Sequence, residues 1–429
     1  MAEVVIIGGA RTAVGAFGGS LKDVPAKDLG ALVIRETLLR LGLAPEVSAP
    51  AKADGPDTFK GAPLSEIEGK YANWPEGSMK IMVDEVIMGN VLMSGQGQNP
   101  ARQAMIRAGL PKETPAFTIN KVCASGMKAI ALGAQSIKAG ENEVVIAGGM
   151  ENMSDVPIAL PKARWGYRMD MPYGQTVDLM VFDGLYEIFY GYHMGVTAEN
   201  IAQKYGITRE EQDRLGVDSH ARARAAIASG ILKGEIVPVK IPQKKGDPLV
   251  FDVDERPMDT NLEKMSKLPT VFKKDGTVTA GNASGINDAA AALLLMSEAK
   301  AKDLGLKPIA RIKGYAAGGV DPSYMGLGPI PAVRKLLRIT GTTIKDYGLF
   351  ELNEAFASQA IACMRELGMD WSITNVNGSG ISIGHPIGCT GARIVLALIN
   401  EMQRRNVSLG LATLCIGGGM GMALAVEAV

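Results

Sequence analysis

Short apolar runs and amphipathic segments follow one another along most of the chain. Residues 4–7 form a β-branched run typical of a buried strand, and residues 27–43 carry leucine and isoleucine at helical spacing. A glycine-rich loop separates the two segments. The same order of strand, loop and helix returns between residue 116 and about residue 139. Strands that alternate with helices predict an α/β fold.

The second part of the chain repeats the element order of the first. Gly126 in the first part matches Gly391, and Asn90 matches Asn353, at nearly equal separations along the chain. These matches indicate an internal duplication. In the second part we predict strands at 310–314, 347–356, 372–378 and 409–419, and helices at 331–339, up to about 368, and at 393–405.

A segment of different composition interrupts the first copy. It separates the strand EVVIAGG from the last apolar run, DAAAALLLMS, and is rich in arginine and lysine. Within it, Thr208 and Glu211 have the spacing of a helix capping box. Residues 46–80 have little periodicity and are expected to form an exposed insertion. The predicted parts are a first half at 1–154 that 286–307 completes, an inserted loop domain at 155–285, and a second half at 308–429.

Charge and composition narrow the classes of function. Lys and Arg total 45, as do Asp and Glu, so nucleic-acid binding is not expected and an anionic ligand would need a local basic patch. The uncharged stretch 406–426 contains several glycines, which favours two buried strands over a membrane span. The N-terminal apolar run has no basic residues before it and does not resemble a signal peptide. We expect a cytoplasmic protein.

Cys123 is a candidate nucleophile, because it lies where a predicted strand passes into a helix, in NKVCASG. The N–H groups and the dipole at a helix N-terminus favour a thiolate. A small buried core residue is the other interpretation. Cys389 has a similar place before the second helix, so this pattern alone does not choose between them. Cys363 falls in the middle of a predicted helix and is expected in the core.

His385 is a candidate general base. It lies in GHPIGCTGAR, where Pro386 restricts its backbone and the flanking glycines allow close approach. A histidine that only caps a turn is the alternative. We expect His193 either to line a pocket or to lie in a turn, and His220 to lie on the surface. The histidines and cysteines lack metal-ligand spacing, so no metal site is expected.

Two more candidates end apolar strands. Cys415 precedes a glycine turn, where a thiol and bare N–H groups could combine proton transfer with an oxyanion site; a buried strand cysteine is the alternative. Asn353 could hold a water or a substrate oxygen, or cap the next helix. The loop GSGISIG departs from the dinucleotide-binding pattern, so NAD is not expected as a cofactor.

Five motifs together resemble the thiolase family: NKVCASGMKA, GGMENMS, NEAFA, GHPIGCTGAR and CIGGGMG. Their order and spacing fit the family, and the resemblance covers nearly the whole chain. It implies two duplicated βαβαβαββ halves that form a five-layered α-β-α-β-α core with an inserted loop domain. It also implies a homodimer or a homotetramer.

The resemblance implies a reversible Claisen condensation of two acetyl-CoA molecules to acetoacetyl-CoA and CoA. Cys123 would carry the acetyl group, His385 would activate it, and Cys415 would remove the α-proton of the second acetyl-CoA. Asn353 would fix a water that forms one oxyanion hole with His385, and the N–H groups of Cys123 and Gly417 would form the other. Coenzyme A thioesters would be substrates, and no cofactor is implied.

The resemblance also implies positions around the pantetheine arm and the acyl group. The stretch with His193 and Met194 is similar to short-chain members of the family. Lys244 and Lys245 would supply positive charge for the nucleotide end of CoA. The remaining positions are Leu185, Ser284, Met325, Ala355 and Phe356.

Three other functions are alternatives to this one. A thiolase with a broader range of 3-ketoacyl-CoA substrates is the main alternative. A β-ketoacyl synthase shares the duplicated fold but lacks a cysteine before the glycine turn, so Cys415 argues against it. A silent CoA- or lipid-binding scaffold would not need Cys123, Asn353, His385 and Cys415 together.

Overall fold

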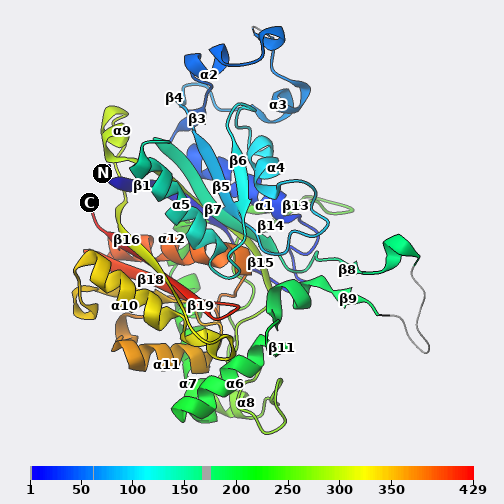
Figure 1. The fold of residues 1–429 in the computed structure, drawn as a ribbon, viewed down its shortest axis with the longest axis vertical. Helices are drawn as coiled ribbons and strands as arrows, with labels where there is room; N and C mark the ends of the chain where they lie inside the picture. The colour runs from blue at the N-terminus through cyan, green and yellow to red at the C-terminus, as the bar shows by residue number, and fades with distance from the viewer. Residues whose placement is uncertain (1, 61, 167–174) are drawn as a thin grey trace.

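The computed structural model describes residues 2–60, 62–166 and 175–429. Within them, an 11-stranded sheet has the strand order β17-β18-β19-β16-β1-β15-β7-β5-β6, with β2 (Gly15–Ala16) and β12 (Ile236–Val237) paired beside this path (Figure 1). No helix in the described residues is both long and apolar enough to cross a membrane. The strands on the path are β1 (Val4–Thr12), β5 (Glu85–Gly89), β6 (Ala116–Ile119), β7 (Val144–Asn152), β15 (Asn287–Ser297), β16 (Ala310–Gly319), β17 (Leu349–Leu352), β18 (Leu409–Ile416) and β19 (Met420–Glu427).

The strand pairing repeats in the two halves of the sheet. In the first half, β5 and β7 are parallel, β7 and β15 antiparallel, and β15 and β1 antiparallel. In the second half, β17 and β18 are parallel, β18 and β19 antiparallel, and β19 and β16 antiparallel. The halves join where β1 pairs with β16, with Val5 opposite Arg311. This repeat agrees with the duplication that the sequence indicates.

Three layers of helices enclose and separate the two halves of the sheet (Figure 1). Each layer has its own apolar core, because the strands bury both faces. The result is the five-layered α-β-α-β-α arrangement expected from the sequence. The outer layer of the first half contains α1 (Ala26–Leu39) and α4 (Pro100–Arg107), the central layer α5 (Ser125–Ala139) and α12 (Ile387–Arg405), and the outer layer of the second half α10 (Pro329–Thr340) and α11 (Ala357–Leu367).

The two central helices cross at the pair of glycines that the duplication matches. A Cβ atom added to Gly126 would lie 2.8 Å from the backbone nitrogen of Ala392. A Cβ added to Gly391 would collide with the backbone nitrogen of Met127. Since backbone atoms cannot turn away as a flexible side chain can, only glycine fits at this crossing.

Replacing Gly391 by alanine is therefore expected to lower the free energy of unfolding by about 3 kcal/mol. Gly69→Ala in α3 (Glu66–Tyr71) is the matched control, since a Cβ there meets no atom within 4 Å. Alanine at that position should be neutral or stabilising by up to about 1 kcal/mol. Urea unfolding of both variants measures the difference, and equal stabilities would contradict the close crossing.

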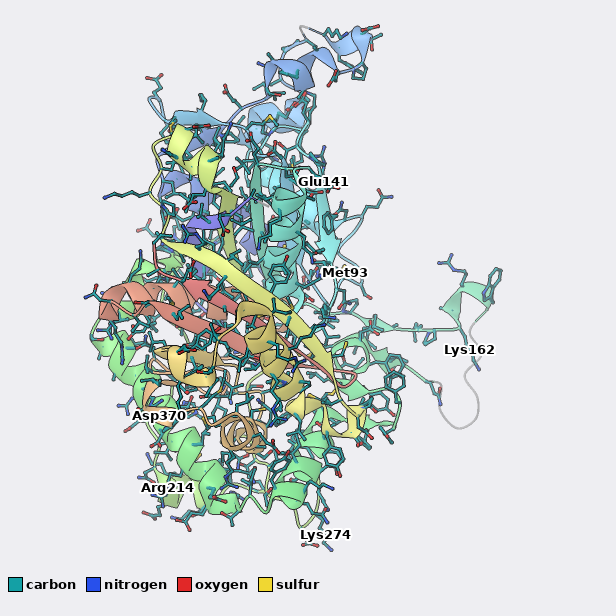
Figure 2. The ribbon with its side chains drawn as sticks, turned by 60° about the vertical axis from the view of Figure 1, so that its left-hand side comes forward. Met93, Glu141, Lys162, Arg214, Lys274 and Asp370 are labelled. Carbon is teal, nitrogen blue, oxygen red and sulfur yellow. The ribbon has the colours of Figure 1, made fainter. Side chains whose placement is uncertain are left out.

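The chain between β7 and β15, which is predicted to form an inserted domain, places its longer helices at the lower end of the molecule in Figure 1 and an antiparallel strand pair beside the first half. The predicted capping box is confirmed: the Glu211 N–H donates to Thr208 Oγ1 at 3.2 Å, and the Thr208 N–H to Glu211 Oε2 at 2.8 Å. A separate arm carries Lys162 and projects from the body (Figure 2). Besides the arm elements β8 (Ile158–Ala159), η2 (Ala163–Trp165) and β9 (Val177–Asp178), the domain contains η3 (Val181–Leu185), β10 (Tyr186–Glu187), β11 (Tyr192–His193), α6 (Met194–Tyr205), α7 (Arg209–Ala228), η4 (Ile231–Gly234), β13 (Val239–Ile241), β14 (Leu249–Phe251) and α8 (Leu262–Ser266).

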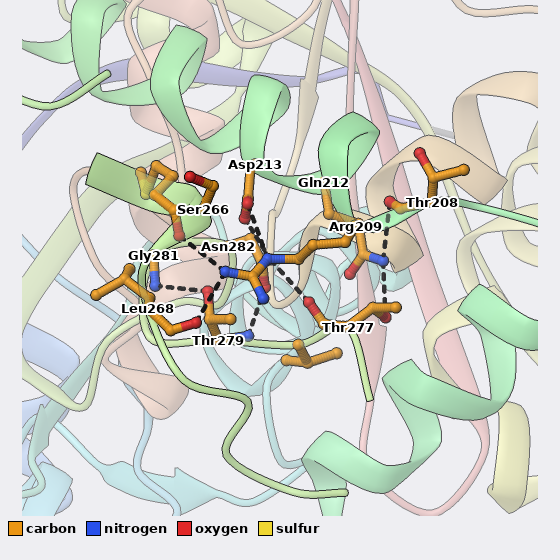
Figure 3. A network of polar contacts seen from close by, with 12 residues as sticks. Thr208, Arg209, Gln212, Asp213, Ser266, Leu268, Thr277, Thr279, Gly281 and Asn282 are labelled. Atoms are coloured by element: carbon orange, nitrogen blue, oxygen red, sulfur yellow. Dashed lines mark hydrogen bonds and ion pairs between the residues drawn. The ribbon is translucent and has the colours of Figure 1, made fainter. Parts of the chain in front are cut away.

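A polar network ties α7 to α8 and to the segment that follows (Figure 3). Arg209 donates from Nε to Asp213 Oδ2 at 2.8 Å and from Nη2 to the carbonyls of Met265 and Leu268. Asn282 Nδ2 donates to the other oxygen of Asp213 at 2.8 Å. These contacts hold the stretch that leads from the inserted domain back to β15.

Residues 46–80 form an exposed insertion, as the sequence predicts, at the top of Figure 1. It contains α2 (Ala49–Ala53), η1 (Asp57–Phe59) and α3, and it lies between the parallel pair β3 (Leu43–Pro45) and β4 (Met79–Ile81). The helix predicted up to residue 43 ends at Leu39, and the left-handed Gly42 (φ 66°) turns the chain into β3.

The sequence predictions for the segment 372–378 and for His220 are also wrong. The strand predicted at 372–378 is a short η7 helix (Trp371–Ile373) followed by a loop. In this loop the side-chain amide of Asn375 replaces the backbone hydrogen bonds that a strand would make. It accepts from Leu352 N–H and donates to Leu352 O, both at 2.8 Å. His220 is fully buried rather than exposed, because the segment at Met258 covers it and donates its N–H to His220 Nδ1 at 3.2 Å.

Candidate active site

A cavity of about 320 Å³ opens where the two halves and the inserted domain meet. Its walls bring together residues that lie nearly 300 positions apart in the chain. Of the residues expected from the sequence, eleven line it: Cys123, Leu185, His193, Met194, Ser284, Met325, Ala355, Phe356, His385, Cys415 and Gly417.

Cys123 lies in a strained turn just before α5. The preceding residue, Val122, has a left-handed backbone (φ 47°), which is rare for a β-branched side chain. Asn120 Oδ1 accepts from Val122 N–H at 2.9 Å. Ser125 Oγ accepts from Lys121 N–H at 2.8 Å and donates to Val122 O at 2.7 Å. These bonds stabilise a turn that presents the cysteine to the cavity.

The two cavity thiols are both protonated at rest. Burial raises the pKa of the Cys123 thiol to about 11, although the Gly417 N–H donates to its sulfur and lowers it. Burial also raises the pKa of Cys415 well above its usual range, with the nearby Cys123 as the second cause. The thiolate expected for Cys123 is therefore corrected, since the loss of solvation outweighs the helix N-terminus.

His385 lies deep in the cavity wall, between Gly384 and Pro386. Its backbone N–H donates to Asn287 Oδ1 at 2.9 Å, and its Nδ1 lies 2.8 Å from Thr390 Oγ1. Burial, followed by the nearby Arg393, lowers the pKa of the imidazole to about 3. Among the described residues its Nε2 has no hydrogen-bond partner. A neutral base with a free nitrogen and the neutral thiol of Cys123 thus line the same cavity.

Alkylation of Cys123 by iodoacetamide should accordingly accelerate with pH without levelling off. Because the thiol pKa is about 11, the thiolate fraction rises about tenfold per pH unit between about pH 7 and 9.5. A cysteine-containing peptide should level off near about pH 8.5 under the same conditions. Peptide mapping after timed quenching measures both rates, and a plateau for Cys123 below about pH 9 would contradict the raised pKa.

The far end of the cavity is apolar. Met194, Met325 and Phe356 belong to one buried cluster, and Phe272 packs against it. The Phe272 ring stacks on His193 with centroids 4.5 Å apart and meets Phe356 edge-on at 6.3 Å. Phe272 was not predicted from the sequence, because it lies outside any helix or strand and carries no motif.

His193 takes the first of the two alternatives considered for it, since it lines the cavity and ends the strand β11 rather than lying in a turn. Its side chain lines the cavity, and its Nδ1 also caps α6 by accepting from Gly195 N–H at 3.0 Å. Gly195 leaves the room that Phe272 occupies, because a Cβ there would overlap the Phe272 ring. The His193 cap of α6 and the place of Phe272 in the cavity wall therefore depend on each other.

Several other predicted residues lie outside the cavity wall. Asn353 is fully buried behind His385, with its Nδ2 3.4 Å from His385 Nδ1. Lys244 and Lys245 are exposed between β13 and β14. Cys363 lies in the core of α11, as predicted. Cys389 is buried inside the first turn of α12 rather than before the helix, and its thiol does not line the cavity.

Comparisons with known proteins agree with this geometry. The family description "Thiolase, N-terminal domain" matches residues 4–49 and 78–299, and "Thiolase, C-terminal domain" matches residues 306–428. The unmatched residues 50–77 fall within the exposed insertion. The predicted boundaries at 154, 285 and 307 stay predictions.

Similar proteins span the whole chain. An acetyl-CoA acetyltransferase of Syntrophomonas wolfei is 55% identical over 428 residues, which cover 99% of each chain. One of Cupriavidus necator is 52% identical over 428 residues, covering all of both chains. The crystal structure of the Bacillus anthracis acetyl-CoA acetyltransferase superposes with a TM-score of 0.88 at 43% identity, covering 100% of this chain and 99% of that one. This chain belongs to the thiolase family.

Proposed function

We propose that this chain is an acetyl-CoA C-acetyltransferase, an enzyme that condenses two acetyl-CoA molecules to acetoacetyl-CoA and CoA and also catalyses the reverse reaction. One observation is the main support for the proposal. The thiols of Cys123 and Cys415 and the unprotonated imidazole of His385 line a single cavity. Relatives about half identical over the full chain carry the same name.

The first step transfers an acetyl group to Cys123. His385 Nε2 takes the proton of the thiol while Sγ attacks the thioester carbonyl of acetyl-CoA. The bond between the carbonyl carbon and the CoA sulfur then breaks, and the proton passes from His385 to that sulfur. The N–H groups of Cys123 and Gly417 are assigned to the oxyanion that forms on the carbonyl oxygen. CoA leaves as a neutral thiol.

The second step forms the carbon–carbon bond. The sulfur of Cys415 removes a proton from the methyl group of the second acetyl-CoA, and the resulting enolate attacks the acetyl carbonyl on Cys123. A water held by Asn353, together with His385, is assigned to the enolate oxygen. The bond to Cys123 breaks, its sulfur regains a proton, and acetoacetyl-CoA leaves. Cys415 needs deprotonation before this step. His385 has already given its first proton to CoA, so its imidazole accepts the proton of Cys415 and returns that proton to the sulfur of Cys123 when the bond to Cys123 breaks.

Mass spectrometry tests the first step directly. Acetyl-CoA alone should add one acetyl group to the peptide that contains Cys123, and added CoA should remove it. No acetylated peptide after rapid quenching would refute the proposed function.

The closed apolar end of the cavity predicts a preference for short substrates. Because we assign the apolar wall of Met325, Phe356 and Phe272 to the end of the acyl site, kcat/KM for acetoacetyl-CoA should exceed that for a ten-carbon 3-ketoacyl-CoA by about 100-fold or more. Met325→Ala should enlarge the cavity and so lower the ratio of the two kcat/KM values. A steady-state thiolysis assay with both substrates decides, and equal values for the parent chain would favour the broader-range thiolase.

The proposal extends to the surroundings of the site. Lys244 and Lys245 are assigned to the CoA phosphates, since both are exposed and free to meet an anionic ligand. No resident cofactor or metal is proposed, because the reaction draws its nucleophile and bases from side chains. The division into halves at 1–154 with 286–307 and at 308–429, with the loop domain at 155–285, is proposed on the repeated strand pairing.

We also propose a homodimer or homotetramer in the cytoplasm. β6 ends the sheet, and no strand of the described chain pairs with its outer edge, which leaves that edge free for a second copy. All four cysteines are free thiols, as in proteins of reducing compartments. Light scattering of the purified protein measures the oligomeric state.

A further inference from the structure

We propose that Thr390 is a positioning residue that fixes the tautomer of His385, so that its Nε2 can accept the proton of Cys123. This inference rests on the proposed function and deepens its first step. Thr390 lies in the first turn of α12, is fully buried, and does not line the cavity. It therefore acts on the reaction only through the imidazole.

The hydrogen atoms around Thr390 can be placed by their partners. Its hydroxyl has a single hydrogen, and Pro386 O, 2.9 Å away, can only accept one. We assign the hydroxyl hydrogen to Pro386 O, since threonine in a helix commonly donates to the carbonyl four residues before it, and a lone pair of Oγ1 then faces His385 Nδ1 at 2.8 Å. A contact of this length against a lone pair requires a hydrogen on Nδ1.

A neutral imidazole carries only one N–H. The imidazole is neutral at physiological pH because burial lowers its pKa to about 3. With the hydrogen on Nδ1, Nε2 keeps its lone pair, and Nε2 is the nitrogen with no partner among the described residues. The Asn353 amide lies 3.4 Å from Nδ1 and is compatible with a hydrogen on Nδ1. Rotating the amide by 180° exchanges its oxygen and nitrogen, so the oxygen can face Nδ1.

Two side chains thus hold His385 from opposite sides. Asn287 Oδ1 accepts from its backbone N–H at 2.9 Å, and Asn287 Nδ2 donates to Gly15 O at 2.9 Å. Thr390 holds the ring. Without the Thr390 oxygen the hydrogen can move to Nε2, and that nitrogen then donates instead of accepting. Cys123, whose thiol is protonated at rest, would keep its proton and attack the thioester slowly.

Thr390→Val removes this oxygen with little other change. Pro386 O keeps the N–H groups of Cys389 and Thr390 as donors, both at 2.9 Å, so no carbonyl is left unpaired. Thr390→Ser retains the hydroxyl. Thr37→Val is the matched control, because Thr37 is also fully buried in a helix and donates to the carbonyl four residues before it, Val33 O at 2.7 Å, but lies in the outer helix α1.

The test measures the single-turnover rate of Cys123 acetylation by acetyl-CoA across pH. Thr390→Val should lower the maximal rate by about 10²-fold or more, with little change in the acetyl-CoA concentration at half-saturation. Thr390→Ser should stay within about threefold of the parent chain, and Thr37→Val should match it. In ¹⁵N NMR of histidine-labelled protein, which has three histidines, His385 should show an Nδ1–H signal in the parent and the other tautomer in Thr390→Val.

The outcomes distinguish a failure of the role proposed for Thr390 from a failure of the proposed function. A parent chain that is never acetylated overturns both. A parent that is acetylated while Thr390→Val reacts at the same rate overturns only the role of Thr390. Equal losses in Thr390→Val and Thr390→Ser would assign the effect to packing and also overturn it. If Thr390→Val fails to fold, the NMR signal of the parent alone decides, since a hydrogen on Nε2 contradicts the inference.

Discussion

Cys123→Ser is expected to abolish the acetyl-enzyme and to lower the rate of acetoacetyl-CoA thiolysis by roughly four orders of magnitude or more. A serine hydroxyl gives up its proton far less readily than a thiol, and burial of position 123 disfavours the charged form further. The single-atom exchange keeps the shape of the turn and its bonds to Ser125. Quenched-flow labelling with radioactive acetyl-CoA measures the intermediate, and steady-state thiolysis measures the rate.

Cys389→Ala is the control for this experiment. Pattern alone did not separate Cys389 from Cys123, and Cys389 is buried in the central helix layer with its thiol outside the cavity wall. Acetylation should therefore survive in Cys389→Ala. Normal labelling in Cys123→Ser, or loss of labelling in Cys389→Ala alone, would transfer the role of nucleophile to Cys389.

Cys415→Ser is expected to slow condensation by about 10³-fold or more while acetylation of Cys123 stays within about threefold of normal. The base is required only when the second acetyl-CoA loses its α-proton, so the two half-reactions should separate. Rapid mixing with acetyl-CoA resolves acetylation from acetoacetyl-CoA formation. Equal losses in both steps would argue that Cys415 supports the site only by packing against Met194 and Phe356.

Cys363→Ser is the matched control for that variant. Cys363 is equally buried, and its thiol donates to Gly326 O, a bond that serine can keep. Both half-reactions should proceed normally. A loss as large as that of Cys415→Ser would mean that any serine in this core disturbs the cavity.

Residues whose type is set by chemistry were the easiest to predict. Cys123, His385 and Cys415 stand near the ends of predicted elements, and the structure brings the three into the wall of one cavity. The match of Gly126 with Gly391 even anticipated a contact, because close helix crossing restricts both positions to glycine in the same way.

What escaped prediction depends on contacts between distant segments. Phe272 lies in irregular chain and reaches the cavity only because Gly195 leaves room for it. His220 looked exposed in a polar helix, yet the segment around Met258 buries it. The loop at Asn375 looked like a strand because a side chain that replaces backbone hydrogen bonds leaves no trace in an apolar pattern.

The strand pairing of β1 also constrains how the chain can fold during its synthesis. β1 (Val4–Thr12) is synthesised long before its main partners β15 and β16, whose residues begin at Asn287 and Ala310. At about 5–20 residues per second, synthesis of the intervening chain takes roughly 15–60 s. During that time an apolar strand with two open edges must be kept from pairing with other chains. Folding of the first half is therefore tied to synthesis of β15 and β16, and nascent chains that stall before β15 are the ones most exposed to aggregation.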